Sequence, residues 1–371
     1  MSNPNTPTST VPSGAELPKS QYLSAPGRSP FESFIAGSRK ELGICGLLLA
    51  LCVVVAVMNH QFLSADNLMD LARRIGIYAI FSIGMGVVII TAGIDLSVGS
   101  VFALMAVLLA MALTTWHWPP ILAVLGVFAL TMTIGLIQGL LISRVPLQPF
   151  IVTLCGLMIF RGLSRFVSGD TDQGFGDGSG FTWLTNLATG NICLVPLSHG
   201  LLNLLPVDSG QHGVPMEFVI MVIVAAIMWV VLHRSVYGRY LFAVGRNEEA
   251  ARYSGINSKA IITSAYVVSG ILAAIAGILL AFYTDSISPT MHGQSYELYG
   301  IAAAVLGGCS LRGGEGSVIG VLIGTALLQV LQNLVNLLGI PSSLNFAVVG
   351  GVILIGVITD EIVKKRSARK V

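Results

Sequence analysis

Residues 261–283 read IITSAYVVSGILAAIAGILLAFY, an apolar run without a single charged side chain. An α-helix of about 20 apolar residues crosses a bilayer core about 30 Å thick and satisfies its own backbone hydrogen bonds there. Similar runs recur along the chain, and only 10% of its residues are Asp, Glu, Lys or Arg, against about 25% in a typical soluble domain. The sequence therefore predicts an all-α, polytopic membrane protein.

About ten apolar runs of this kind are candidates for transmembrane helices. They are residues 42–58, 75–92, 97–115, 121–142, 150–166, 216–232, 261–283, 297–310, 317–338 and 344–360. Together they define a transmembrane domain at 41–361. Residues 1–40 are rich in Ser, Pro, Asn and Thr, which is typical of a disordered tail, and residues 362–371 form a basic tail.

The basic residues favour one orientation of these spans. If the N-terminus is cytoplasmic and ten spans alternate, all of the 20 Lys and Arg residues lie on the cytoplasmic side except Arg73, Arg74, Arg161 and Arg165. The positive-inside rule therefore predicts that both termini are cytoplasmic. Two hydrophilic segments stand out in this topology. They are an extracytoplasmic loop at 167–213 and a cytoplasmic loop at 233–260.

Two glycine-rich breaks between apolar runs resemble each other. Residues 93–101 and 308–318 each follow an apolar run and end in Gly-Ser-Val before the next one. Two pseudo-repeated halves, a common plan among transporters, would explain this similarity. Chance is the alternative in a chain that contains 42 glycines.

The cytoplasmic loop carries the signals of a short helix. Asn247 can cap the N-terminus of this helix, and the carboxylates of Glu248 and Glu249 suit the positive end of its dipole. Gly255 suits the position after its C-terminus. The loop therefore predicts a helix of about two turns between two spans, which a partner could grip.

The same segment carries a resemblance to a known family. Glu249-Ala250-Ala251-x-x-x-Gly255 resembles the Glu-Ala-Ala loop of bacterial ABC importer permeases. From about residue 60 to residue 360, further segments are similar to the ribose-type sugar permeases and occur in the same order. They are residues 84–100, 148–154, 161–162, 238–245, 296–311 and 336–339. The chain departs from the family in its long tail 1–40, its extended loop 167–213, and Arg246 and Arg312 at positions where small residues are common.

The resemblance implies the membrane permease of an ABC importer for a monosaccharide or similar small polyol, located in the bacterial inner membrane. It implies that the short helix couples the permease to a separate ATPase subunit, through Asn247, Glu248, Glu249, Ala250, Ala251, Gly255 and Ile256. That subunit would bind ATP and magnesium, and this chain would bind no cofactor. The other expected partners are a periplasmic sugar-binding protein and a second permease chain, identical or different.

Polar residues near the ends of spans are candidates for a gate or a pathway. Asp95, with Ser97 beside it, either lines a pathway or caps the helix that follows, because a carboxylate close to an apolar span is costly and often functional. Glu297 could meet substrate hydroxyls, or it could be a first-turn acid that faces the helix dipole. Asn333 and Asn336 share one helical face and could bind sugar hydroxyls or join helices.

Four other polar side chains in the spans also have more than one possible role. Arg161 and Arg165 could receive acidic groups of an external protein, pair with the acidic loop 167–213, or extend to lipid head groups. Gln138 and Thr153 could bind sugar hydroxyls in a pathway, but hydrogen bonds between helices are favoured for both.

The sequence also argues against an enzyme. No Gly-Lys dipeptide occurs, so a Walker A phosphate loop is absent, and no cluster has the spacing of metal ligands or of a nucleophile and its base. The alternative function is a self-sufficient secondary transporter or channel for a small polar solute. That function would need carboxylates in mid-span, whereas Asp95, Glu297 and Glu315 all fall at predicted span ends.

Overall fold

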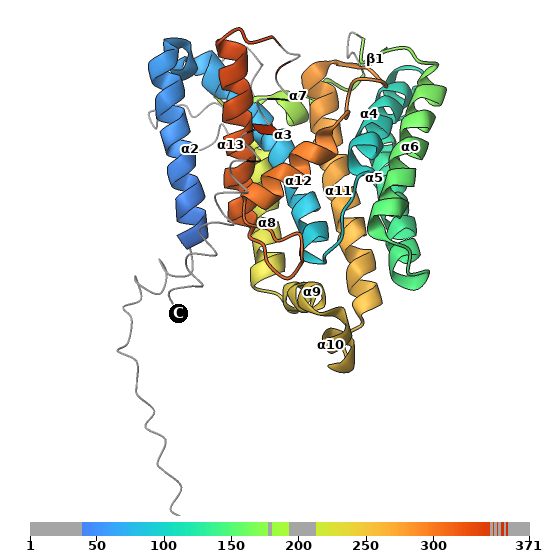
Figure 1. Cartoon of the computed structure of the whole chain (residues 1–371). Coiled ribbons are helices and arrows are strands. Elements are labelled where there is room, and N and C mark those ends of the chain that lie inside the picture. The colour runs from blue at the N-terminus through green and yellow to red at the C-terminus, as the bar shows by residue number, and fades with distance from the viewer. Residues whose placement is uncertain are drawn as a thin grey trace, which may run out of the picture. The chain divides into compact units, whose positions relative to one another are not determined.

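The computed structural model describes residues 39–176, 180–192 and 213–341, and the single positions 344, 347, 350, 351 and 354. The predicted tails, the middle of the loop 167–213 and most of the predicted span 344–360 lie outside the described residues. The described residues from Lys40 onwards belong to one compact unit built of α-helices (Figure 1).

The apolar helices of the described part follow the predicted runs. They are α2 (Arg39–Met58), α3 (Ala65–Ile90), α4 (Val98–Thr114), α5 (Pro120–Arg144), α6 (Pro149–Ser168), α8 (Met216–His233), α11 (Ser258–Thr284), α12 (Tyr296–Leu306) and α13 (Val318–Leu337). Short helices connect them, namely η1 (His60–Leu63), α7 (Thr182–Thr189), α9 (Val236–Arg246) and α10 (Glu248–Tyr253). Two antiparallel pairs of two-residue strands have no counterpart among the predicted elements. They are β1 (Gln173–Gly174) with β4 (Ser286–Ile287), and β2 (Asn191–Ile192) with β3 (Val214–Pro215).

The structure supports the membrane class and leaves the number of spans as a prediction. Within the described residues, six helices are long and apolar enough to cross a membrane, namely α3, α5, α6, α8, α11 and α13. The predicted runs 42–58, 97–115 and 297–310 correspond to shorter apolar helices. A full set of ten spans would also need the run 344–360, which is largely outside the described part.

Helix α3 begins well before its predicted start at residue 75. Its first residue is Ala65, and the side chain of Ser64 caps it by accepting the N–H of Asn67 at 3.3 Å. The predicted start was wrong because the first turns carry charged side chains such as Asp70 and Arg74, which interrupt the hydropathy signal but not the helix.

Helix α12 is shorter than the predicted run 297–310. It ends at Leu306, and Gly307 and Gly308 follow it. Gly308 has a φ of +90°, a conformation that ends a helix and that glycine adopts without steric cost. The prediction extended too far because the residues after this stop are small and partly apolar.

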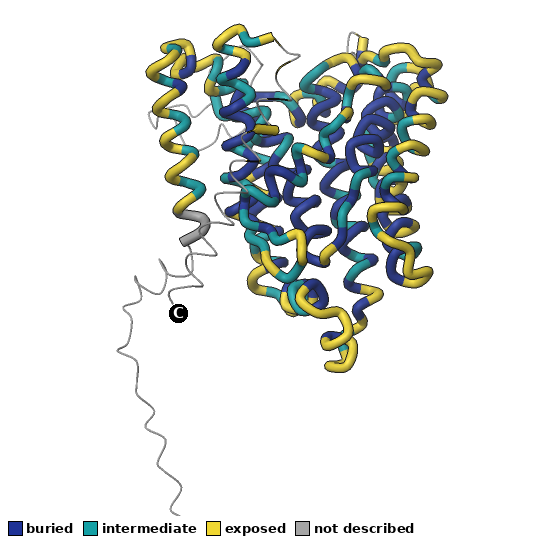
Figure 2. Tube along the Cα trace, in the orientation of Figure 1, coloured by how far each residue is buried: buried dark blue, intermediate teal, exposed yellow. Residues whose placement is uncertain are grey.

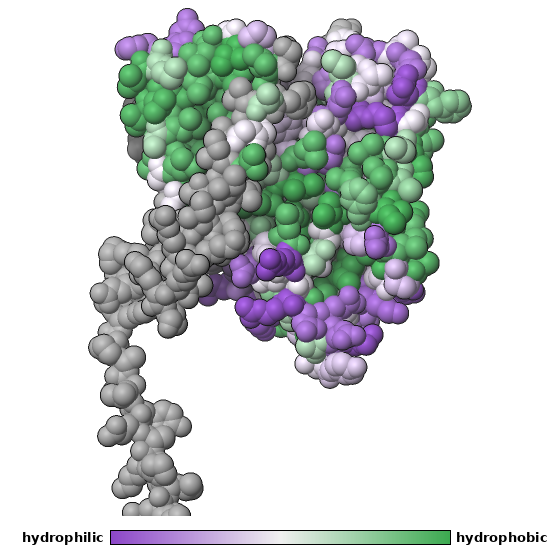
Figure 3. Space-filling model, viewed as in Figure 1, coloured by the Kyte–Doolittle hydropathy of each residue, from purple (hydrophilic) through white to green (hydrophobic). Residues whose placement is uncertain are grey.

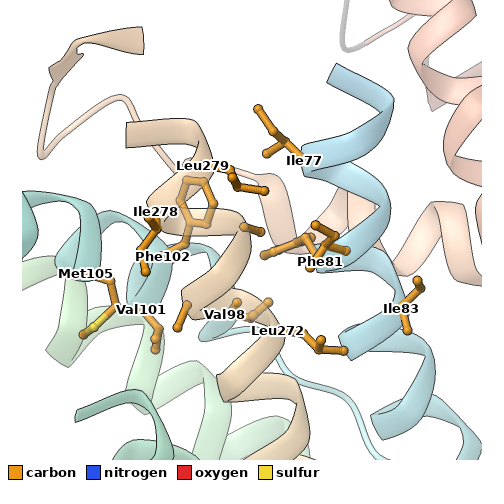
Figure 4. Packing of buried hydrophobic residues seen from close by; sticks show 14 of the residues in the cluster. Ile77, Phe81, Ile83, Val98, Val101, Phe102, Met105, Leu272, Ile278 and Leu279 are labelled. Atoms are coloured by element: carbon orange, nitrogen blue, oxygen red, sulfur yellow. The ribbon is translucent and has the colours of Figure 1, made fainter. Parts of the chain in front are cut away.

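The core lies where α11 packs against α3, α4 and α5. Figure 4 shows Phe81 of α3 and Phe102 of α4 directed toward the α11 side chains that include Leu272 and Ile278. A methyl group at Gly270 would lie 2.7 Å from the carbonyl oxygen of Thr131, so α11 and α5 approach each other almost backbone to backbone. Such close packing through small residues is typical of helix pairs in membranes.

The surface and the interior differ in the way expected for a helix bundle in lipid. Buried residues gather on the inner helices, whereas α5, α6 and α8 expose much of their surface (Figure 2). Those exposed side chains are apolar, as at Leu125, Ile159 and Ile227. Figure 3 shows a hydrophobic band with hydrophilic residues beyond it, including those around α9 and α10. A bilayer core would cover this band.

Two helices begin inside the bundle and not at its ends. Helix α4 follows an extended segment that returns from the end of α3, and α12 follows the segment after β4 (Figure 1). Their first turns meet, because a methyl group at Gly99 would lie 2.5 Å from the carbonyl oxygen of Gly293 and would overlap the Glu297 carboxylate. Such interrupted helices are typical of substrate pathways in transporters.

Candidate functional site

The predicted coupling segment forms a short helix, α10, whose ends are fixed by its own residues. The side chain of Asn247 accepts the N–H of Ala250 at 2.9 Å. Gly255 follows the helix with a φ of +83°, and the N–H of Ile256 donates to the carbonyl of Ala251 at 3.0 Å. The predicted helix, cap and stop are confirmed.

Helix α10 projects from one end of the bundle and exposes most of its side chains (Figure 2). Glu248, Glu249 and Ala250 are exposed, whereas Ala251 is buried, so the two alanines do not form one exposed face. Tyr253 is 81% exposed. A shallow cavity of about 400 Å³ lies beside the helix. It is lined by Phe242, Ala243, Arg246, Asn247, Ala250, Ala251, Ser254, Ile256 and Gly314.

The end of α9, just before α10, touches two other segments through glycines. A methyl group at Gly245, near the end of α9, would overlap the carbonyl oxygen of Ile90, the last residue of α3. The same methyl group would lie 2.7 Å from the backbone nitrogen of Gly314, and the N–H of Gly314 donates to the Ile90 carbonyl at 2.9 Å. A methyl group at Gly313 would lie 2.5 Å from the Gly245 carbonyl oxygen.

We call this contact of Gly245, Gly313, Gly314 and Ile90 the glycine junction. It joins α9, the end of α3 and the loop between α12 and α13 at one point. The loop contains the second glycine-rich break, and the end of α3 leads into the first, so the junction lies between the two breaks and close to α10.

Asp95 lies in a buried polar network at the break between α3 and α4. It is 4% exposed, and its Oδ1 accepts the backbone N–H of Ser97 at 2.9 Å and the Ser97 hydroxyl at 2.7 Å. Ser97 Oγ in turn accepts the side-chain amide of Gln138 on α5 at 2.8 Å. Asp95 therefore shapes the turn before α4, close to the capping role, and is linked through Ser97 to α5. Its role in a pathway or gate stays a prediction.

The carbonyl of Ile94 holds the same break against two more helices. It accepts the hydroxyl of Thr153 on α6 and the hydroxyl of Tyr266 on α11, both at 3.3 Å. Gln138 thus joins α5 to the N-cap of α4, as the sequence favoured, whereas Thr153 joins α6 to the break before α4 and not to another helix. A methyl group at Gly156 would lie 2.6 Å from the amide nitrogen of Gln138, so the α6 backbone closes over the network.

Glu297 is 8% exposed and lies in the first turn of α12, where its carboxylate faces Gly99 of α4. Near it, Arg161 of α6 donates to the carbonyl oxygens of Pro289 at 3.0 Å and His292 at 2.6 Å. Burial lowers the pKa of His292, and its Nδ1 accepts the backbone N–H of Ser288 at 2.8 Å, which closes the turn at 288–292.

The two arginines of α6 have different roles. Arg161 fixes the segment that precedes α12, as its contacts with two carbonyl oxygens show. Arg165 forms a bidentate pair with Asp170 of the loop 167–213, at 2.6 and 3.0 Å. Pairing with the acidic loop, one of the roles considered from the sequence, is therefore confirmed for Arg165 alone.

The candidate residues on α13 do not act as a pair. Asn333 exchanges side-chain hydrogen bonds with Asn67 of α3, at 2.7 and 3.3 Å, and so joins two helices. Asn336 is exposed, and neither residue reaches the network at Asp95. A pathway role for both stays a prediction.

Sequence reasoning missed several features of the site. The exposed Tyr253 and the contact of Gly245 with Gly313 and Gly314 were not anticipated, although all four lie in or beside the quoted motifs. Glu217, at the start of α8, is 0% exposed, and neither of its carboxylate oxygens has a hydrogen-bond partner among the described residues. Its position at the edge of an apolar run gave no signal of this burial.

These features define a membrane transport subunit. A bundle of apolar helices encloses two helices that begin in its interior, and a short capped helix projects from one end. No group of three or more His, Cys, Asp or Glu residues that could hold a metal occurs in the described part of the chain.

Comparison with known proteins gives the family. The family model for the permease component of the branched-chain amino acid transport system matches residues 67–357. The ribose import permease of Bacillus subtilis is 37% identical over 334 residues, which cover 90% of this chain and 95% of that protein. The fructose import permease of Rhizobium meliloti is 30% identical over 337 residues, which cover 91% and 89%. No solved structure matches the chain.

The chain therefore belongs to the branched-chain amino acid and ribose family of ABC importer permeases. The resemblance read from the motifs is confirmed. Members of this family are multi-pass, non-catalytic membrane subunits that bind no cofactor, and the family implies an ATPase and a binding protein as partners.

Proposed function

We propose that this chain is the permease of an importer for a monosaccharide or similar small polyol in the bacterial inner membrane. The relatives support the cargo class, since their names include ribose, fructose and xylose import. A separate ATPase would bind ATP and magnesium and receive α10. A periplasmic sugar-binding protein would deliver the cargo at the opposite end, and a second permease chain, identical or different, would complete the pathway.

The glycine junction is the observation that carries this proposal. A partner that pulls or pushes α10 moves the end of α9, where Gly245 lies against Ile90 with no side chain between the two backbones. A contact of this kind has no flexible side chain to absorb the displacement. Movement of α10 would therefore shift the end of α3 and the loop at Gly313 and Gly314 together.

The displaced segments lead to the candidate gate. The end of α3 continues into the network of Asp95, Ser97 and Gln138, and α4 begins directly after it. On the other side, α12 brings Glu297 against the first turn of α4. A shift at the junction would thus reach both interrupted helices, and changing their mutual packing is how the structure would open and close a path.

The coupling assignment is tested by two substitutions on the exposed segment. Glu249→Lys reverses a charge on α10, and Gly255→Asp places a side chain at a φ of +83°. We expect both variants to insert into the membrane and to lose nearly all ATP-driven sugar uptake, because the ATPase no longer seats on α10. Uptake is measured in proteoliposomes with the ATPase and the sugar-loaded binding protein, and association is measured by co-purification of the ATPase.

Arg144→Glu is the matched control, because Arg144 is an exposed residue in the last turn of α5 and lies outside α10. It should retain uptake and association. Normal co-purification of the ATPase with both α10 variants would refute the coupling role, and uptake by this chain without any ATPase would support the self-sufficient transporter instead.

A further inference from the structure

A row of polar side chains lies on one face of α3 within a helix long enough to cross the membrane. Asp70, Arg74 and Tyr78 are four residues apart and so lie one above another on the same helical face. This face meets two other helices. Tyr283 of α11 donates its hydroxyl to Asp70, and Tyr296 of α12 packs against Tyr78 with ring centroids 5.2 Å apart. We call these five residues the tyrosine cluster.

The cluster is joined by a salt bridge at one end and by aromatic rings at the other. Arg74 Nε lies 3.0 Å from Asp70 Oδ2. Phe102 of α4 lies 5.5 Å from Tyr296, centroid to centroid, with the rings steeply inclined. Figure 4 shows Phe102 and Phe81 between α3, α4 and α11. The polar residues Asp70 and Arg74 are thus followed along α3 by aromatic rings, which lie near the first residues of α4 and α12.

The cluster is accessible although it belongs to the inner helices. The side chains of Asp70 and Arg74 are each 39% exposed, and Tyr78, Tyr283 and Tyr296 are half-buried. By contrast, 78% of the apolar window of α3 is buried. Asp70 and Arg74 lie in the first turns of α3, at the end that the basic residues predict to be extracytoplasmic, so the accessible pair is placed where a cargo would enter. The surfaces of α5, α6 and α8 that would face lipid expose apolar side chains such as Leu125 and Ile227 instead.

The chemistry of the cluster matches a neutral, polyhydroxylated ligand. A carboxylate accepts hydrogen bonds, a guanidinium donates them, and a tyrosine hydroxyl does both, which is what a sugar with many hydroxyls requires. Aromatic rings offer flat apolar surfaces for the C–H faces of the same sugar. Asp70 and Arg74 compensate each other in charge, so the cluster has no excess charge to select an ion.

We propose that Asp70, Arg74, Tyr78, Tyr283 and Tyr296 form a contact site for a neutral sugar as it passes through the permease. This inference rests on the proposed function and adds the residues that touch the cargo.

The test removes single hydroxyl groups without removing a ring. Tyr78→Phe, Tyr283→Phe and Tyr296→Phe are compared with the wild type in proteoliposomes that contain the ATPase and the binding protein, with D-ribose, D-xylose and D-fructose as labelled probes. Tyr240→Phe is the matched control, because Tyr240 is an exposed tyrosine on α9, away from the cluster. We measure sugar carried per ATP hydrolysed as well as uptake.

We expect each cluster variant to carry about two- to tenfold less of the preferred sugar per ATP, the effect of losing one hydrogen bond. The ATPase activity itself should stay within the range of the wild type and of Tyr240→Phe. A purely structural role would lower uptake and ATPase activity together and would overturn the proposal, as would wild-type sugar yield per ATP in all three cluster variants.

The outcomes keep the two proposals separate. If the wild type shows no ATP-driven uptake of any of the three sugars, the proposed function fails and the cluster has no sugar to contact. If the wild type carries a sugar and the cluster variants carry it equally well, the permease function stands and the contact site is refuted.

Discussion

At the scale of single residues, the glycine junction is the most constrained point of the described structure. Gly245 has no room for a side chain, because an added methyl group would overlap the carbonyl oxygen of Ile90. That oxygen belongs to the backbone, so it cannot rotate away as a side chain could. Gly313 and Gly314 add φ values of +81° and +74°, which side chains adopt only with strain.

We therefore expect Gly245→Ala to uncouple the permease. The added methyl group must push α9 away from α3, so sugar uptake should fall at least about tenfold. The free energy of unfolding in detergent should decrease by about 1–3 kcal/mol, as for other overpacked contacts. Gly162→Ala is the control, because no atom lies within 4 Å of the added methyl group on α6. If Gly245→Ala takes up sugar at the wild-type rate, the glycine junction does not transmit the movement of α10 to α3.

Some of these residue roles could be read from the sequence and others could not. The cap at Asn247 and the stop at Gly255 were predictable, because both act through hydrogen bonds and dihedral angles of neighbouring residues. The contact of Gly245 with Gly313 joins positions far apart in the chain and depends on backbone distances that leave no local pattern. A glycine-rich motif indicates that another backbone could approach closely, but it does not indicate which segment of the chain does so.

At the scale of elements, α10 owes its shape to its own ends. A helix of six residues has little intrinsic stability, so the cap from Asn247 and the glycine stop decide whether it is formed before a partner binds. The long helices were predicted well for a different local reason, because each corresponds to an uninterrupted apolar run of the length that a bilayer requires. The error at α3 arose because Asp70 and Arg74 belong to the tyrosine cluster, and a hydropathy profile places the end of a span where charged residues begin.

We expect Asn247→Ala to weaken the docking of the ATPase by about fivefold, since losing an N-cap costs about 1 kcal/mol. Asn247→Asp keeps an acceptor for the Ala250 N–H and should retain most of the affinity. Affinity is measured with the permease in nanodiscs and the purified ATPase. Equal affinities for the wild type and Asn247→Ala would mean that the partner orders α10 by itself.

At the scale of the whole molecule, a hydrophobic band separates the two ends of the bundle, and the hydrophilic residues around α10 lie beyond it (Figure 3). Which end faces the cytoplasm stays a prediction from the basic residues. Helix α7 and helix α10 lie at opposite ends of the bundle (Figure 1). The fold class was predictable because a bilayer imposes one length and one polarity on every span. The interior starts of α4 and α12 were not, because the sequence shows a break but not the depth at which the chain resumes a helix.

We expect Tyr253→Cys to react with a membrane-impermeant maleimide only in inverted membrane vesicles, because Tyr253 is 81% exposed on α10 and should face the cytoplasm. Trp183→Cys, on α7 and 50% exposed, should react only in intact spheroplasts. The native chain is labelled in parallel, since it carries five cysteines. The reverse pattern would invert the topology and remove α10 from the reach of any cytoplasmic ATPase.

Both ends of α10 are fixed by residues of the same segment, and this affects how the proposed complex with an ATPase would assemble. A docking element that is folded in advance loses little conformational entropy on association, so the encounter with the ATPase resembles the meeting of two rigid bodies. If α10 docks on the ATPase as proposed, recognition would depend on the shape and charge of a few exposed side chains, such as Glu249 and Tyr253, and not on a folding reaction. One ATPase could therefore serve several permeases that present the same small surface, while each permease keeps its own cargo.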